Sequence, residues 1–318
     1  MQPSISKELF QLLKAQKYHI VGQHSAVKRC RWLYNTLIHD QPCYKQKFYG
    51  INTHQCIQMT PTVFSCTMRC LFCWRAQSGD KGLRWEESTL QACDDPEDIV
   101  EDCIKAQMRL LSGYKANPKA NKEKYREALK PRHAAISLAG EPTLYPQLGD
   151  LIKSFHRKGF TTFLVSNGTM PEELSKLSEE PTQLYISACA PDKKTYLKTC
   201  RPQIPNAWEK LNETLALLSS FKCPTVLRIT LARHLNLKHP ERYAKLIEKA
   251  NPTYVEPKAY MHVGFSRLRL TYANMPLHEE IKDFATSLAE KTGYKMLDES
   301  KESRVVLLSR LEKPIKLR

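Results

Sequence analysis

The residues of this chain best suited to chemistry are three closely spaced cysteines, Cys66, Cys70 and Cys73. Their C-x3-C-x2-C spacing differs from the ferredoxin spacings and places three thiolates in one short loop. Three thiolates can bind three irons of a 4Fe–4S cluster and leave the fourth iron open to a substrate, as open metal positions generally do. The alternative is a zinc site with His54 as fourth ligand, but zinc typically uses paired C-x2-C knuckles. The spacing therefore favours an iron–sulfur cluster.

Three further cysteines, Cys30, Cys43 and Cys56, precede this loop at two equal intervals of 13 residues. These intervals are too long for one knuckle, but three loop segments can converge and bind a second 4Fe–4S cluster with one open iron. The alternative is a set of unrelated buried thiols, because free cysteine is among the most buried residue types. Polar and basic neighbours fit apolar burial poorly, so we favour the second cluster. The cysteines without ligand spacing, interpreted as structural, are Cys93, Cys103, Cys189, Cys200 and Cys223.

Strand-like and helix-like patterns alternate along the chain and must position these cysteines. The predicted strands are 61–65, 134–139, 161–166, 184–188, 225–231 and 253–261, followed by two short strands at 294–298 and 304–309. The predicted helices are 3–17, 96–112, 146–158, 171–178, 206–220, 240–250 and 277–291, and the segment before residue 60 reads as irregular. Six strands alternating with helices predict parallel β/α units, in a doubly wound sheet or a partial barrel. Ligands of such folds bind beyond the carboxyl ends of the strands, where this chain places several polar residues.

Composition and charge narrow the class of protein. The 318 residues include 42% hydrophobic residues, which is typical of a globular protein and excludes a disordered chain. No run approaches the roughly 18 apolar residues of a membrane span, and no secretory signal begins the sequence, so a cytoplasmic protein with no membrane partner and reduced thiols is expected. The 49 Lys and Arg exceed the 33 Asp and Glu and give a net charge of +16. Such an excess attracts polyanions and favours a nucleic-acid partner.

The cysteine loop and the motif Gly140-Glu141-Pro142-Thr143 together resemble the radical S-adenosylmethionine (SAM) superfamily. The resemblance implies an α/β fold, a partial TIM-like (β/α)6 barrel. It also implies that the open iron binds SAM, and that one-electron reduction cleaves SAM to a 5′-deoxyadenosyl radical. The SAM-binding residues implied by the resemblance are Phe72, Gly140, Glu141, Thr143, Asn167 and Ser187.

Three widely spaced cysteines before that loop, with Lys45 just after the second, resemble more narrowly the tRNA 4-demethylwyosine synthase family. The resemblance covers nearly the whole chain, including 202–212 and 258–276, and matches the shorter archaeal form without a flavodoxin-like domain. It implies an N-terminal extension that carries the second cluster, a radical SAM barrel and a small C-terminal extension. The corresponding boundaries are 1–60, 61–275 and 276–318.

This family resemblance implies a carbon–carbon lyase that joins 1-methylguanosine, beside the anticodon of tRNA-Phe, to two carbons of pyruvate and forms 4-demethylwyosine. The radical would take hydrogen from the N-methyl group, the methylene radical would attack the keto carbon of pyruvate, and the carboxyl carbon would leave as formate. Lys45 can hold pyruvate as a Schiff base, or the open iron of the second cluster can chelate it, or both can act. The alternative interpretation is that Lys45 is a surface lysine or one that faces a phosphate. A monomer served by an external one-electron donor, of ferredoxin or flavodoxin type, is expected.

Affinity for tRNA requires cations for phosphates and aromatic rings for stacked bases. The segment 109–132 carries eight Lys or Arg against two acids, and 301–318 carries six against two, although either can be a solvated surface. Trp74 and Trp85 are candidates for stacking, with core packing as the alternative. The predicted tRNA contacts are Lys115, Lys119 and Lys122 in the first segment, and Lys258, Arg267 and Arg269 near the last strand of the barrel.

Two other classes of protein compete with this interpretation. A zinc-stabilised RNA-binding protein would explain the charge and the cysteines but not the polar residues at the strand ends. Another radical SAM enzyme, a glycyl-radical activase or a tRNA methylthiotransferase, would share the cysteine loop. An activase has no need of a +16 charge, and a methylthiotransferase would carry an additional C-terminal RNA-binding domain, which is not evident in this sequence.

Overall fold

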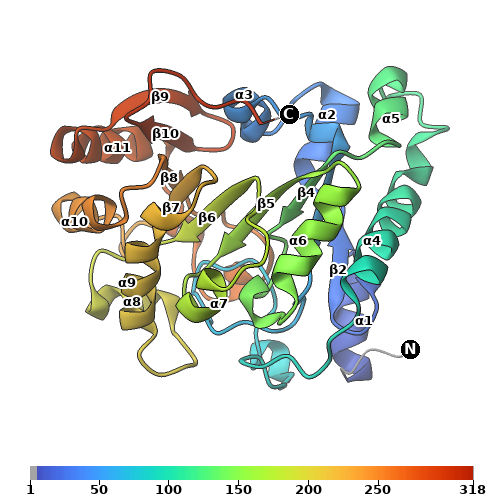
Figure 1. Ribbon diagram of the computed structural model, residues 1–318, viewed down its shortest axis with the longest axis horizontal. Coiled ribbons are helices and arrows are strands. Elements are labelled where there is room, and N and C mark those ends of the chain that lie inside the picture. Colours follow the sequence, from blue (N-terminus) through green and yellow to red (C-terminus); the bar gives the residue numbers. More distant parts are fainter. Residues whose placement is uncertain (1–5, 318) are drawn as a thin grey trace.

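Ten strands join into one continuous sheet in the order β1-β2-β3-β4-β5-β6-β7-β8-β10-β9 (Figure 1). The computed structural model describes residues 6–317. The strands are β1 Tyr18–Val21, β2 Ser25–Lys28, β3 Cys56–Thr60, β4 His133–Ile136, β5 Thr161–Ser166, β6 Gln183–Ser187, β7 Thr225–Leu231, β8 Tyr254–Ala259, β9 Lys295–Ser300 and β10 Val305–Ser309. Strands β3 to β8 pair in parallel, whereas β1 and β2 extend one edge and β10 and β9 the other in antiparallel pairs. The parallel strands and their helices form the predicted partial (β/α)6 barrel.

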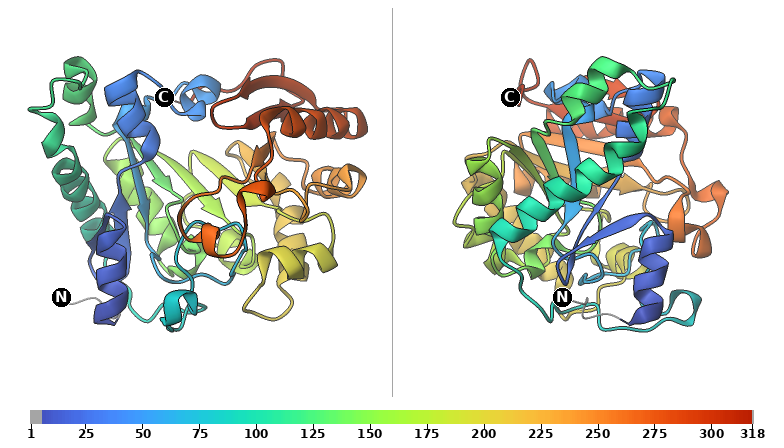
Figure 2. Two further views of the ribbon diagram at one scale, coloured as in Figure 1. Left: turned by 180° about the vertical axis from the view of Figure 1, so that it is seen from behind. Right: turned by 90° about the vertical axis from the view of Figure 1, so that its right-hand side faces the viewer.

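Helices α4, α6, α7, α9, α10 and α11 cover one side of the parallel sheet, and long loops cross the other side (Figure 2). The α-helices are α1 Lys7–Ala15, α2 Arg31–His39, α3 Tyr44–Tyr49, α4 Pro96–Leu111, α5 Lys122–Ala128, α6 Leu148–Arg157, α7 Pro171–Ser175, α8 Lys193–Cys200, α9 Ala207–Leu217, α10 Pro240–Ala250 and α11 His278–Thr292. The 3-10 turns are η1 Thr53–Gln55, η2 Asp80–Gly82, η3 Ser112–Tyr114, η4 Pro142–Leu144, η5 Leu218–Ser220, η6 Gly264–Leu268 and η7 Tyr272–Asn274. Within 6–317, no helix combines the length and apolar character of a membrane span.

The two faces of the parallel sheet bury different cores because successive strand residues point to opposite sides. On the helical side, Leu164 of β5 packs in a large aliphatic core that includes Ile152 of α6. On the other side, Phe163 of β5 and Tyr185 of β6 pack with Phe48 of α3 in a core rich in aromatic rings. Helix α3 therefore closes the inner side of the barrel near the amino-terminal ends of the strands.

The end of the described chain fastens α3 in this position. The backbone N–H of Leu317 donates to the carbonyl of Tyr49 at 2.9 Å, and Lys316 Nζ donates to the carbonyl of Phe48 at 3.0 Å. Leu317 is buried in the same aromatic core as α3. These contacts satisfy carbonyls at the helix C-terminus, which have no partner inside the helix.

The predicted strand at 61–65 is wrong, and the first parallel strand is β3, at Cys56–Thr60. Residues Cys56 to Met59 pair with His133 to Ile136 of β4. Pro61 follows directly and has no backbone N–H to continue the ladder. The chain then turns toward the cysteine loop, and the Val63 N–H donates to the His24 carbonyl at 2.9 Å.

The region before residue 60 is also more regular than predicted. It contains the β1–β2 hairpin and helices α2 and α3, whose four- to nine-residue lengths give weak periodic signals. The leading helix is confirmed from Lys7, and residues 3–5 of that prediction lie outside the described residues. Helices α5 and α8 were not predicted, whereas the predicted strands and helices from 134 onward agree with the structure within a few residues. The division at residues 60 and 275 stays a prediction.

A buried amide fixes the carboxyl end of β7, and its loss should destabilise the fold. Asn236 is fully buried, accepts a hydrogen bond from Ala232 N, and donates to the carbonyls of Cys189 and Thr230, all at 2.7 Å. We expect Asn236→Ala to lower the free energy of unfolding by about 3 kcal/mol, because buried backbone groups lose their partners. Anaerobic urea titration measures this change. The exposed neighbour Lys238 is the control, since Lys238→Ala should stay within about 0.5 kcal/mol of wild type; equal effects of the two variants would contradict the prediction.

Candidate active site inside the barrel

A cavity of about 360 Å³ opens at the carboxyl ends of the parallel strands. All three cysteines of the predicted first cluster line it, together with residues that follow β4, β5 and β6. Its deeper wall contains Arg228 of β7 and Lys258 of β8. The cavity therefore joins the cysteine loop to the charged interior of the barrel.

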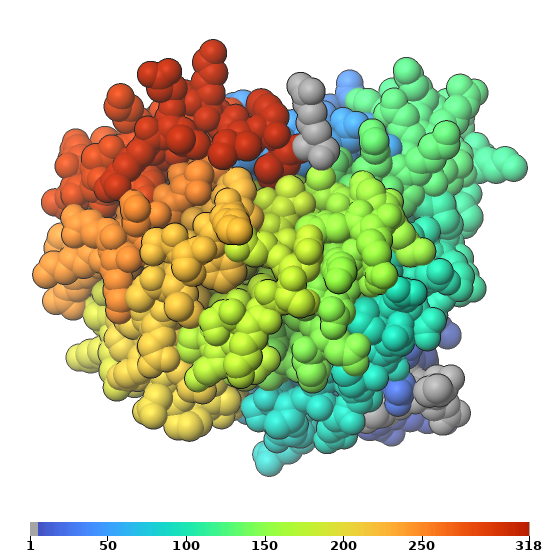
Figure 3. Space-filling view, in the orientation of Figure 1, coloured from blue at the N-terminus to red at the C-terminus, as the bar shows by residue number. Residues whose placement is uncertain are grey.

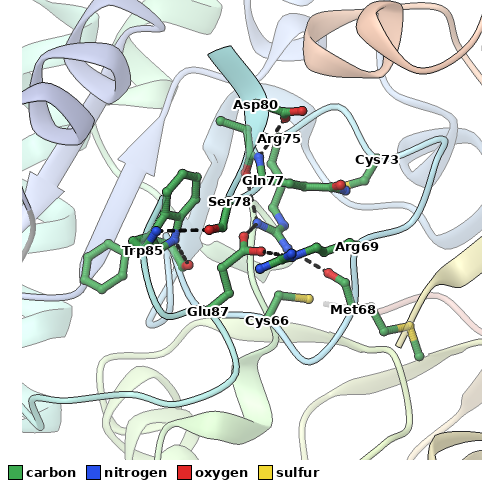
Figure 4. Close-up of polar contacts among 12 residues, drawn as sticks. Cys66, Met68, Arg69, Cys73, Arg75, Gln77, Ser78, Asp80, Trp85 and Glu87 are labelled. Carbon is green, nitrogen blue, oxygen red and sulfur yellow. Dashed lines mark hydrogen bonds and ion pairs between the residues drawn. The ribbon is translucent and has the colours of Figure 1, made fainter. Parts of the chain in front are cut away.

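A buried ion pair holds the cysteine loop in place (Figure 4). Arg75 Nη1 donates to Glu87 Oε1 at 2.6 Å, and its Nη2 donates to the Met68 carbonyl at 2.8 Å. The other oxygen of Glu87 accepts from Arg69 Nε at 2.7 Å. The backbone N–H of Cys66 donates to the Glu87 carbonyl at 2.5 Å. Both members of the ion pair, Arg75 and Glu87, therefore bind the backbone of the cysteine loop.

The loop offers three sulfur donors to one end of the cavity. Burial raises the pKa of the Cys66 thiol to about 12, and burial also raises the pKa of the Cys73 thiol. Positive charge must therefore stabilise the thiolates. Arg75 lowers both pKa values, and the backbone N–H groups of Met68 and Arg75 donate to the two sulfurs. Three sulfurs, without a fourth ligand in the motif, fit a 4Fe–4S cluster with one open iron.

The zinc alternative fails at its fourth ligand. His54 Nε2 bonds to Glu127 Oε2 of α5 at 2.5 Å. His54 lies before the start of β3, whereas the loop that begins at Cys66 follows its end, so the strand separates the two. Among residues 6–317, no three His, Cys, Asp or Glu side chains are arranged around a position for a single metal ion.

The motif at Gly140 shapes the cavity wall. Gly140 has a φ of +73°, and a Cβ atom there would collide with the carbonyls of Thr62 and Ser65. Glu141, 1% exposed, accepts hydrogen bonds from Ser166 Oγ at 2.8 Å and from the Asn167 N–H at 2.7 Å. Its carboxylate thereby joins the end of β4 to the end of β5.

Five of the six predicted SAM-binding residues line the cavity. They are Phe72, Gly140, Glu141, Asn167 and Ser187. Asn167 Nδ2 also donates to Thr67 Oγ1 at 2.9 Å and lies 3.9 Å from Cys66 Sγ, which connects the wall to the cysteine loop. Thr143 is not part of the cavity lining and instead donates to Glu141 Oε1 at 2.7 Å.

The second cysteine set lies at the amino-terminal end of β3. Cys30 and Cys43 directly precede α2 and α3, and Cys56 is the first residue of β3. Burial, and secondly the negative charge of Cys30, raises the pKa of the Cys43 thiol to about 11 and that of the Cys56 thiol to about 12. The three sulfurs are thus close enough to interact electrostatically. This donor set fits a second cluster, and Lys45 favours its thiolate form.

Lys45 extends from the first turn of α3 into the barrel. Its Nζ atom lies 4.0 Å from the ring centroid of Phe163 and 4.1 Å from that of Tyr185. Burial, and secondly the charge of Arg228, lowers the pKa of Lys45 to about 8. About one amine in ten is therefore neutral at pH 7, the state in which it can act as a nucleophile, against far fewer for an ordinary lysine.

A buried carboxylate, which sequence reasoning missed, organises the cations around Lys45. Glu256 of β8 is fully buried and accepts from Arg228 Nη2 at 2.8 Å, Tyr49 Oη at 2.7 Å and Tyr44 Oη at 3.2 Å. Burial acts to raise the pKa of Glu256, but Arg228 and Lys45 outweigh it and the pKa lies below its usual value. Charged residues inside the apolar strands 225–231 and 253–261 were the signal that could have revealed this network.

Two of the predicted tRNA contacts, Lys258 and Arg269, have partners inside the protein. Lys258 lines the cavity and donates to the Ser303 carbonyl at 2.5 Å, and burial lowers its pKa to about 8. Arg269 pairs with Asp80 at 2.6 Å and donates to the carbonyls of Leu71 and Cys73, so it supports the cysteine loop. A carbonyl holds the Lys258 ammonium and a carboxylate pairs with Arg269, which sequence position does not reveal, and a contact of either with tRNA stays a prediction.

The remaining predicted tRNA contacts are exposed but lie in two separate places. Arg267 is exposed in η6, beside the cavity. Lys115, Lys119 and Lys122 are exposed around α5, which projects from one corner of the molecule (Figure 3). That corner adjoins η1 and α2, at the amino-terminal end of β3, because the Asn121 N–H donates to a carbonyl of α2 and Glu127 bonds to His54.

Two cysteines interpreted as structural prove to lie in the cavity wall. Cys189 and Cys200 both line it, and a hydrogen bond to Cys200 raises the pKa of the Cys70 thiol.

Trp74 and Trp85 both pack against the core, which is the alternative to a role in stacking on RNA bases. Trp74 stacks on Tyr18 with ring centroids 6.1 Å apart, and Trp85 Nε1 donates to the Phe64 carbonyl at 2.9 Å.

Comparison with known proteins agrees with this site. The family model "Radical SAM superfamily" matches residues 60–247, and "Wyosine base formation" matches residues 249–310. An S-adenosyl-L-methionine-dependent tRNA 4-demethylwyosine synthase of Pyrococcus abyssi is 51% identical over 312 residues, which is 97% of this chain and 90% of the relative. The synthase of Methanocaldococcus jannaschii is 43% identical over 96% of each chain.

The fold of a solved relative is also similar over the whole chain. The structure described as "Structure of TYW1 with a lysine-pyruvate adduct bound" superposes with a TM-score of 0.88 at 41% identity and covers 98% of this chain and 99% of its own. Identity at this level over nearly the full length, together with the match to the radical SAM model, establishes the relationship. The chain belongs to the family of S-adenosyl-L-methionine-dependent tRNA 4-demethylwyosine synthases.

Proposed function

We propose that this chain is a tRNA-modifying radical SAM enzyme that condenses 1-methylguanosine, beside the anticodon of tRNA-Phe, with pyruvate to give 4-demethylwyosine. SAM is cleaved to 5′-deoxyadenosine and methionine in the reaction. The observation that carries the proposal is one cavity lined by the C-x3-C-x2-C cysteines and by Arg228, whose positive charge contributes to the lowered pKa of Lys45. The relative with a lysine–pyruvate adduct supports the same assignment.

Cys66, Cys70 and Cys73 hold the first 4Fe–4S cluster in this proposal, and Cys30, Cys43 and Cys56 hold the second. Cys66, Cys70 and Cys73 would hold a cluster that, when bound and reduced, would supply the electron for cleavage of SAM. The wall at Gly140, Glu141 and Asn167 positions SAM against this set, and Phe72 and Ser187 extend the wall. The absence of a side chain at Gly140 permits the close backbone approach that a bound cofactor needs.

Lys45 attacks the keto carbon of pyruvate with its neutral amine, and loss of water gives a Schiff base. The positive charges of Arg228 and Lys258 attract the pyruvate carboxylate to this place. Arg228 Nη2 is bound to Glu256 and to Tyr44 Oη at 2.6 Å, whereas its Nη1 has no partner among residues 6–317 and can donate to the substrate. The lysine adduct of the solved relative favours this arrangement over the alternative in which the second cluster alone binds pyruvate.

The finer assignments belong to the same proposal. The reaction class is a carbon–carbon lyase, because the bond between the carboxyl and keto carbons of pyruvate breaks. The electron comes from an external one-electron donor of ferredoxin or flavodoxin type. The oligomeric state, a monomer, stays a prediction.

The direct test is mass spectrometry of the tRNA after anaerobic incubation. tRNA-Phe that carries 1-methylguanosine is mixed with reconstituted protein, pyruvate, SAM and a reductant. We expect the tricyclic base, with one 5′-deoxyadenosine for each base formed. Labelled pyruvate should leave two of its carbons in the base. Unchanged 1-methylguanosine, in a reaction that contains both iron clusters, would remove the proposed function.

Pyruvate should be trapped on Lys45 by borohydride. Because the amine is reactive only when neutral and its pKa is about 8, the trapping rate should rise about tenfold per pH unit below that value and level off above it. Peptide mass spectrometry locates the adduct. Lys47, two residues along α3, pairs with Asp298 at 2.7 Å, so Lys47→Ala should trap pyruvate normally while Lys45→Arg should not. Trapping by Lys45→Arg would assign the adduct to another lysine.

Mutations in the two cysteine sets should have different effects on the reaction. Cys70→Ala should abolish cleavage of SAM, whereas Cys43→Ala should retain cleavage but form no tricyclic base. Each variant should retain about four irons instead of about eight, as expected for the loss of one of two clusters. Iron analysis and chromatography of 5′-deoxyadenosine measure both effects. Exposed Cys93 provides the control, and Cys93→Ala should match wild type. Normal product from Cys43→Ala would argue against a role for the second set.

A further inference from the structure

The loop between β8 and α11 presents exposed apolar side chains beside the cavity. This segment, residues 261–277, is called the mouth loop and contains η6 and η7. Tyr272 is 67% exposed and Leu268 is 59% exposed, and Val263 and Leu277 are exposed as well. Val263 also lines the cavity. Clustered exposed apolar groups at the edge of a cavity mark an interaction site more often than scattered ones do.

The mouth loop is fastened to the cysteine loop. Arg269 donates to the carbonyls of Leu71 and Cys73, and the Phe265 N–H donates to the Trp74 carbonyl at 2.9 Å. Figure 2 shows the mouth loop, in orange, crossing the blue segment that carries the cysteines. A molecule bound to the mouth loop therefore has a defined position relative to the first cysteine set.

The ring of Tyr272 is held in place although it is exposed. It contacts the His262 ring edge to face, with centroids 6.1 Å apart and an interplanar angle of 89°. His262 Nδ1 in turn bonds to Tyr260 Oη at 2.9 Å. Asn274 caps the turn and donates to the Arg233 carbonyl at 3.0 Å. An exposed aromatic ring held by its edge loses little side-chain entropy on stacking with a ligand.

Cations without acidic partners accompany these apolar groups. Arg267 of η6 is exposed and pairs with no carboxylate among residues 6–317. Lys81, in the adjacent η2 turn, lies 5.5 Å from the ring centroid of Phe265 and also lacks an acidic partner within the described chain. Aromatic rings that stack on unpaired bases, next to cations that contact phosphates, are the typical surface for a single-stranded RNA loop.

We propose that the mouth loop is the surface that receives the anticodon loop of the tRNA, with Tyr272 stacked on an unpaired base and Arg267 at a phosphate. The inference rests on the proposed function and names the RNA-binding surface of that site. The net charge of +16 favours a polyanion over a second copy of this chain, which would repel. The basic corner around α5 adjoins the amino-terminal end of β3, whereas the mouth loop adjoins the cysteine loop that follows the carboxyl end of this strand, so the mouth loop is the surface next to the first cysteine set.

The test compares tRNA affinities of reconstituted variants under anaerobic conditions. We expect Tyr272→Ala to raise the dissociation constant about 5- to 150-fold, the range for loss of one stacked base, and Tyr272→Phe to bind like wild type. Arg267→Gln should weaken binding and reduce the slope of log K against log[salt] by about one. The controls are Leu129→Ala, an exposed apolar residue next to α5, and Lys291→Gln, an exposed cation of α11. Neither control should change the affinity.

Three results would overturn the inference. The first is Tyr272→Ala with wild-type affinity for tRNA. The second is unchanged affinity with slower cluster reduction by a flavodoxin-type donor, which would identify a donor site. The third is unchanged affinity with an altered oligomeric state in sedimentation, which would identify a contact between copies. Failure of wild-type protein to form the tricyclic base would instead contradict the proposed function, whatever the affinities.

Discussion

The interior of this barrel depends on the balance of buried charge around Glu256. One carboxylate faces three cationic side chains, those of Lys45, Arg228 and Lys258, and the latter two also line the cavity. Burial of ions is costly unless opposite charges and hydrogen bonds compensate, so the surplus of positive charge requires further anions. Cys43 and Cys56 lie close enough to Lys45 to supply such charge as thiolates, and the carboxylate of the proposed substrate pyruvate would supply more.

The two cysteine sets lie at opposite ends of the parallel strands. The loop with Cys66 follows the carboxyl end of β3, and Cys56 begins the same strand. Side chains that point inward from β7 and β8 span the distance between these ends. In the proposed reaction, the cavity between these ends is where the radical formed near the first cysteine set would meet pyruvate, beside Arg228 and Lys258.

The sequence predicted those features of the molecule that depend only on residues close together in the chain. The C-x3-C-x2-C spacing, the motif at Gly140 and the strands from 134 onward needed no knowledge of tertiary contacts. The β3 boundary was missed because its pairing ends at Pro61. The internal partners of Lys258 and Arg269 were not predicted, because a cation reads alike in sequence whether water or a buried carbonyl is its partner. Glu256 and Tyr272 acquire their roles only from neighbours that are distant in the sequence.

The contact between the end of the chain and α3 bears on the order of assembly. Leu317 and Lys316 bind the carbonyls of the helix that carries Lys45, and β10 completes the sheet beside β8. These residues follow every helix and strand of the described chain, so they leave the ribosome after all of those elements. Helix α3, and with it the enclosure of Cys43 and Lys45, therefore reaches its final position only after β10 and the segment behind it have been synthesised.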